Sequence, residues 1–261
     1  MQLSDEQWAE ITAKVPRAVE IQSRLLLPVV LIAMKAGPKK RLDIATVCLH
    51  DASEVACEVV YALDQAYASL VWFREVHPQA PLETEACIRG KFYADDAALR
   101  LYATAEHIAN FIVAFLEIEK STLGPYEEKN ASHAHVVGKY LMKEMPTHEI
   151  SMAVKDLLTE KNWGKAMNYR NMWVHEQPPL IEGVGTVYER KGRWTKTEHG
   201  YALGIGGGDK PQYTIDSLLE MVLSTSHALM KLLGTLTEIL YARLRALGIE
   251  VNESGQTTVK F

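Results

Sequence analysis

Apolar residues recur at every third or fourth position through most of this 261-residue chain, and this helical period restricts the fold more than any other feature. Two long stretches show it over many turns. Between residues 96 and 119 the apolar positions are Leu101, Ala105, Ile108, Ile112, Phe115 and Leu116. Between residues 214 and 247 they are Ile215, Leu218, Val222, Leu229, Leu233, Leu236 and Leu240. Helices with such stripes bury them against one another, so the pattern predicts an all-α fold.

Capping and helix-breaking residues set the expected helix boundaries. Ser4, followed by Glu6 and Gln7, predicts the first helix start, and prolines at positions 16 and 28 interrupt the pattern that follows until Gly37-Pro38 ends it. Long helices are expected over about 43–76 and 215–247. Shorter ones are expected over about 96–119, 126–145, 148–161 and 163–175, with a short segment at 83–92. The expected N-caps are Asp43, Asp95, Asp96, Thr147, Asn162 and Thr214.

One region departs from the helical period. Residues 184–189 and 194–203 are rich in Val, Tyr, Trp and Thr around Lys191-Gly192, which predicts a β-hairpin with its turn at that dipeptide. We therefore expect one helical domain over 1–261. It has a helical extension at 1–42, a hairpin insertion at 180–210 and a polar, mobile tail at 250–261.

Composition and charge exclude several functional classes. A net charge of −5 argues against a protein that coats nucleic acid by bulk charge. Three scattered cysteines are too few for a disulfide framework or a thiolate zinc site, which favours a reducing, cytoplasmic location. The first ten residues are acidic where a signal peptide would be basic. The longest apolar run, 25–34, contains Pro28 and is too short to span a bilayer, so we interpret it as a kinked core helix with no role in a membrane.

The strongest chemical signal lies at the end of the expected helix 163–175, where Arg170 and Asn171 precede His175. Asn171 and His175 are i,i+4 neighbours on one helical face, and the long Arg170 side chain can reach round to them. Imidazole can take a proton from a ribose 2′-OH or give one to the leaving 5′ oxygen. A guanidinium can hold the phosphate. The residues therefore favour phosphodiester cleavage of RNA without a metal or another cofactor, because the 2′-OH itself is the nucleophile.

The R-x4-H spacing, with a polar residue directly after the arginine, resembles the motif of HEPN domains. The resemblance implies a small antiparallel helical bundle that forms a homodimer and brings two motifs to one cleft, with ribonuclease activity in many members. It implies catalytic roles for Arg170, Asn171 and His175. The expected substrate-binding residues, for RNA or a nucleotide, are Glu106, Asn110, Lys165 and Tyr169. Some HEPN toxins carry a modified tyrosine two residues after the histidine; Gln177 stands there in this chain, which puts that regulation in doubt.

Two other interpretations stay open. The chain could be a catalytically silent HEPN-like module that binds nucleotides or a protein partner. It could also be a helical structural dimer in which Arg170 pairs with Glu106 or Glu176 and pins helices together. Glu106 and Asn110 could face the Arg–His cleft or form a buried pair. The charge distribution gives modest support to RNA binding. Residues 161–196 hold seven basic and three acidic side chains, a net charge of +4, which leaves −9 for the rest of the chain.

Overall fold

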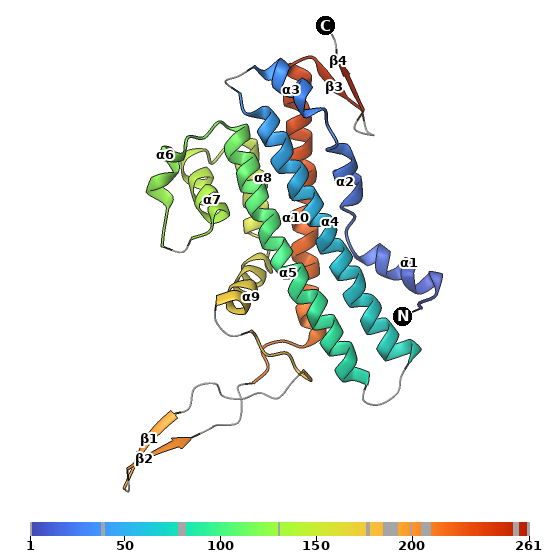
Figure 1. Cartoon of the computed structure of the whole chain (residues 1–261), viewed down its shortest axis with the longest axis vertical. Coiled ribbons are helices and arrows are strands. Elements are labelled where there is room, and N and C mark those ends of the chain that lie inside the picture. Colours follow the sequence, from blue (N-terminus) through green and yellow to red (C-terminus); the bar gives the residue numbers. More distant parts are fainter. Residues whose placement is uncertain are drawn as a thin grey trace.

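The computed structural model describes residues 2–37, 40–77, 82–129, 131–175, 178–184, 193–198, 200–204, 210–252 and 256–259. Three long helices form its centre: α4 (Leu42–Val71), α5 (Leu82–Phe115) and α10 (Ile215–Ala246). Figure 1 shows α4 and α5 as an antiparallel pair with α10 along them, and each of the three packs on the other two. Their stripes meet in the core, where fully buried side chains include Leu49, Leu63, Leu101, Phe111, Leu218 and Leu229. The predicted all-α architecture is confirmed.

Local sequence signals explain several helix ends. α1 (Asp5–Lys14) begins with a capping box between Ser4 and Gln7, and α10 begins with one between Thr214 and Ser217. α3 (Val29–Ala36) ends at Gly37, whose φ of 81° suits a residue without a Cβ. These boundaries confirm three of the expected starts and stops. The expected N-cap Asp43 is wrong, because α4 begins at Leu42 after Arg41 and Asp43 lies in its first turn.

The apolar run 25–34 does not form one core helix. α2 (Val19–Arg24) ends before it, Pro28 precedes α3, and the run is buried on one side only. Leu25 and Ile32 lie in the core, whereas Val30 and Met34 are about three-quarters exposed. α1, α2 and α3 all pack on α4. Among the residues that the structure describes, no helix is long and apolar enough to cross a membrane.

A second layer of short helices covers α5 and α10 (Figure 1). After the π-helical turn η1 (Trp72–Val76) and α5 come α6 (Lys120–Leu123), the 3-10 turn η2 (Gly124–Tyr126), α7 (His133–Glu144), α8 (Glu149–Leu158) and α9 (Trp163–His175). α7 and α9 pack on α5, while α8 and α9 pack on α10. The expected start next to Asn162 is confirmed for α9, and the residues that follow His175 lie outside the described part of the chain.

Three expected helix starts in this part of the chain are wrong. α5 runs without a break from Leu82, so Asp95 and Asp96 lie inside it and cap nothing. Their carboxylates are satisfied there by basic side chains four residues away, Lys91 and Arg100. α7 starts at His133 rather than 126, and His148, not Thr147, caps α8 by accepting a hydrogen bond from the amide of Ile150.

The predicted hairpin exists, but its turn is elsewhere. β1 (Arg193–Thr197) pairs antiparallel with β2 (Gly200–Gly204), so both strands come from the expected second strand and the turn follows Thr197. Lys191-Gly192 lies outside the described residues. Figure 1 shows this hairpin extending away from the helices. The tail also departs from expectation, because β3 (Ile249–Val251) pairs with β4 (Thr257–Val259) and Ile249 is fully buried.

Candidate functional site

The motif residues lie on α9, which is fixed between α5 and α10. The Asn162 side chain, just before α9, donates a 2.7 Å hydrogen bond to the Ser224 hydroxyl of α10. Ala166 and Tyr169 form the buried face of the helix. Asn171 and His175 are exposed, whereas Arg170, next to Tyr169, is partly buried.

Asp95 of α5 holds the C-terminal half of α9 in place. Its Oδ1 accepts a 2.5 Å hydrogen bond from the buried Tyr169 hydroxyl, and its Oδ2 accepts bonds from Trp173 Nε1 at 3.1 Å and Lys91 Nζ at 2.5 Å. Burial, and then the Asp95 carboxylate, hold the pKa of Tyr169 far above its ordinary value, so the phenol stays a donor. Tyr169 directly precedes the motif and Trp173 lies within it, so this anchor fixes the helical turn that carries the motif.

Arg170 joins the three motif residues. Its Nη1 donates to Asn171 Oδ1 at 3.0 Å and lies 3.4 Å from His175 Nε2. Its Cζ lies 3.7 Å from the centre of the Tyr102 ring, a cation–π contact with α5. Its Nε is buried and has no hydrogen-bond partner in the described part of the chain. A guanidinium only donates, so a hydrogen bond between these two side chains would have Nε2 as its acceptor.

These residues line a cavity of about 970 Å³, here named the motif pocket. Its walls come from α5, the segment before α7, the start of α7, the end of α8 and the outer face of α9. The lining side chains that carry polar or aromatic groups are Tyr102, Glu128, Lys129, Ser132, His135, Trp163, Arg170, Asn171 and His175. A cavity of this size can admit a nucleotide with its phosphate.

The predicted substrate-binding residues do not share this pocket. Tyr169 is 1% exposed and belongs to the core beneath the site. Glu106 Oε1 accepts a 3.2 Å hydrogen bond from the amide of Ala134, so this carboxylate caps the start of α7 and pairs with neither Arg170 nor Asn110. Asn110 and Lys165 are exposed and are not part of the pocket wall. Glu176, the other candidate partner of Arg170, lies outside the described residues.

Several pocket residues were not found from sequence, among them Tyr102, Lys129 and His135. Tyr102 lies 68 positions before Arg170, and its ring is an ordinary core candidate on an amphipathic helix. His135 belongs to the pair His133-x-His135 at the start of α7. Helix geometry turns side chains two residues apart to different sides, and only His135 lines this pocket.

Glu128 is the one carboxylate that lines the motif pocket among the described residues, and it is already paired. It forms an ion pair with Lys139, and its Oε2 lies 3.8 Å from His135 Nε2. The hydrogen bond from Lys139 holds the pKa of Glu128 below its ordinary value. Glu128 therefore leaves the Arg170 charge unopposed.

One group in the described part of the chain has the spacing of metal ligands: His50, Asp51 and Glu54, with ligand atoms within 4.8 Å of one another. It lies on α4, which contributes nothing to the motif pocket. The chemistry of the motif pocket therefore has to be derived from its own side chains.

Comparisons with protein-family models, with curated proteins and with solved structures gave no match to this chain. Function is therefore inferred from the geometry of the motif pocket.

Proposed function

We propose that the chain is a metal-independent endoribonuclease of HEPN type, with its reaction centre in the motif pocket. The observation that carries this proposal is the contact of the Arg170 guanidinium with His175 Nε2, at the wall of a cavity large enough for a nucleotide. A guanidinium, which can bind phosphate, beside an imidazole nitrogen, which can accept a proton, supports the proposal because cleavage by an internal 2′-OH requires both.

His175 is the general base in the proposed reaction. Nε2 takes the proton of a ribose 2′-OH, the 2′ oxygen forms a bond to phosphorus, and the bond from phosphorus to the 5′ oxygen breaks. The leaving 5′ oxygen takes a proton from an acid on its other side. The products are a 2′,3′-cyclic phosphate and a 5′-OH, and no redox change or external reactant is needed.

Arg170 stabilises the charge that develops on the phosphate. Its guanidinium stacks on Tyr102 and forms no ion pair in the described part of the chain, so it is held in place with its charge available to a phosphate. When a phosphate enters, Nη1 can exchange its long contact with His175 for a charge-assisted hydrogen bond to the substrate. Asn171 limits the positions of the guanidinium by accepting from Nη1.

A homodimer is part of the proposal. One chain supplies one Arg170 and one His175, and a second copy facing the first would supply the acid that protonates the leaving oxygen. His135 is the other imidazole of the motif pocket and is the acid that a single chain could supply.

The direct test is to incubate the purified full chain with end-labelled single-stranded RNA, with and without EDTA, and to identify the product ends. We expect cleavage that EDTA does not slow, with 2′,3′-cyclic phosphate and 5′-OH ends. An RNA carrying a single 2′-deoxy substitution at the cleaved position should resist cleavage there. Metal-dependent cleavage that leaves 5′-phosphates would refute the mechanism.

A further inference from the structure

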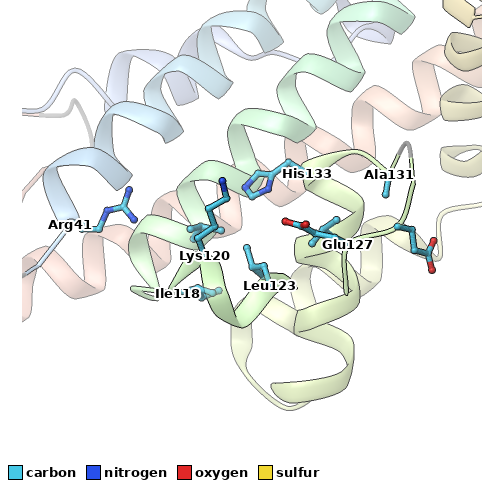
Figure 2. A pocket seen from close by; sticks show the side chains of 10 residues that line it. Arg41, Ile118, Lys120, Leu123, Glu127, Ala131 and His133 are labelled. Carbon is cyan, nitrogen blue, oxygen red and sulfur yellow. The ribbon is translucent and has the colours of Figure 1, made fainter. Parts of the chain in front are cut away.

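A second pocket adjoins the motif pocket, and the function proposed above makes no use of it. It has a volume of about 520 Å³ and is here named the distal pocket. Arg41 at the start of α4, Lys120 of α6 and His133 of α7 line it together with Glu127. Figure 2 shows these side chains reaching the pocket from separate elements. Within the described ranges, none of the three basic side chains forms an ion pair.

The two pockets share a wall. Glu128 and Ala131 line both, so the segment that leads into α7 forms the ridge between them. The first turn of α7 presents His133 to the distal pocket and His135 to the motif pocket. The two imidazoles diverge because they are two residues apart on a helix. A chain that crosses this ridge would meet an imidazole on each side.

The charge lining the combined pockets has the opposite sign to that of the whole chain. Four fixed cations line them, namely Arg41, Lys120, Lys129 and Arg170, against two carboxylates, Glu127 and Glu128. That is a balance of +2 before any histidine is protonated, in a chain whose net charge is −5. The local charge therefore favours a polyanion in this region despite the negative net charge of the chain.

We propose that the distal pocket binds backbone phosphates of the same single-stranded RNA that is cleaved in the motif pocket, with Arg41, Lys120 and His133 as the contacts. This inference rests on the proposed ribonuclease function and adds the substrate class: an oligonucleotide that spans both pockets, not a mononucleotide. Glu127 opposes the phosphate and limits the affinity of this subsite.

The test compares RNA binding by length in full-length chains carrying His175→Ala, which keeps the probe uncut. Fluorescence anisotropy is measured over a range of NaCl concentrations with labelled single-stranded RNAs of about 4 and about 14 nucleotides, the range of known single-strand sites. Lys120→Ala and Arg41→Ala should each lower the affinity for the long RNA. Each should also lower the slope of log affinity against log salt concentration by about 0.7, the value for one lost phosphate contact. The short RNA should bind as before. Glu127→Gln should raise the affinity for the long RNA and leave the affinity for the short RNA unchanged.

Lys155→Ala and Arg243→Ala are the matched controls, because both side chains are exposed and neither lines the two pockets. Circular dichroism melting of every variant separates a lost contact from a lost fold. Equal effects on both RNAs, or no effect of the Arg41 and Lys120 changes on the long RNA, would overturn the distal subsite while leaving the ribonuclease proposal standing. If no RNA of either length binds the parent chain, the proposed function fails, and the subsite fails with it.

Discussion

At the scale of single residues, Arg170 determines what the motif pocket can do. Its guanidinium contacts Asn171, His175 and the Tyr102 ring, while its Nε has no partner in the described part of the molecule. Glu106, one candidate partner for a structural role, accepts instead from the amide of Ala134. The described ion pairs include none to Arg170, so its charge remains available to an anion.

Tyr102 should position Arg170 through the face of its ring. Tyr102→Leu removes that face, and we expect RNA turnover to fall about 3- to 10-fold, the equivalent of roughly 0.6–1.4 kcal/mol for a partly exposed cation–π contact. Tyr102→Phe keeps the ring and should retain turnover. Steady-state cleavage rates on both variants provide the measurement, and equal rates for Leu and Phe would show that the ring face does not matter.

Asp95 should be worth more to stability than its neighbour Asp96. Asp95→Ala leaves the buried Tyr169 hydroxyl and Trp173 Nε1 without an acceptor, so we expect a loss of about 1–3 kcal/mol in the free energy of unfolding. Asp96→Ala removes only a surface pair with Arg100, with an expected loss below about 1 kcal/mol. Urea denaturation measures both. A larger loss for Asp96 would contradict the anchor assigned to Asp95.

At the scale of elements, three helices are joined at one end by a single arginine. Arg74 of η1 forms ion pairs with Glu83 near the start of α5 and Asp216 in the first turn of α10, both at 2.7 Å. Its hydrogen bonds hold the pKa of Glu83 and of Asp216 below their ordinary values of 4.5 and 3.8. Close by, a Cβ at Gly90 would lie 2.9 Å from Ile215 Cγ1, so α5 and α10 approach closely here.

The ion pairs of Arg74 with Glu83 and Asp216 should make the free energy of unfolding depend on pH in the acid range. Both carboxylates have a lower pKa in the folded than in the unfolded chain, so their contribution is present above their ordinary pKa values and is lost as the pH falls through the folded values. We expect Arg74→Ala to cost about 1 kcal/mol at neutral pH, because the carboxylates are largely exposed, and progressively less below about pH 4. Denaturation across pH measures the difference. Arg17→Ala, which removes an exposed pair with Glu20, is the control. A constant difference at all pH values would contradict this assignment.

Sequence predicted the elements whose signals are local and missed those set by tertiary contacts. The caps at Ser4 and Thr214 need only neighbours within one helical turn, so they could be read directly. Asp95 has the composition of an N-cap, yet it lies inside α5 because Lys91 and Tyr169 supply its donors, and Tyr169 is 74 residues away.

The same limit applied to the site. The local spacing of Arg170, Asn171 and His175 was sufficient to bring them together. Tyr102 and His135 reach the motif pocket only through the packing of α5 and α7, which no short-range pattern specifies.

At the scale of the whole molecule, the proposal is that two chains together form the reaction cleft. The motif pocket opens on one face of the bundle and contains a single copy of Arg170 and His175. We expect light scattering at micromolar concentration to give twice the 29.2 kDa of one chain. Mixing a His175→Ala chain with an Arg170→Ala chain should then restore part of the activity that each lacks alone. A monomer that cleaves RNA at full rate would contradict the two-chain cleft and leave His135 as the acid.

The central claim is that His175 moves a proton in RNA cleavage and is not a structural pin. The measurement that tests it most directly is the cleavage rate in EDTA together with the melting temperature, on the parent chain, His175→Ala and His227→Ala. His227 is an exposed histidine of α10 whose Nε2 lies 3.0 Å from the Lys14 carbonyl oxygen, and it lines neither pocket. We expect His175→Ala to lose roughly 10²–10⁴-fold in rate with little change in melting temperature, and His227→Ala to keep its rate. A parent chain that cleaves no RNA, or a His175→Ala chain that loses several degrees of melting temperature but no activity, would contradict the account.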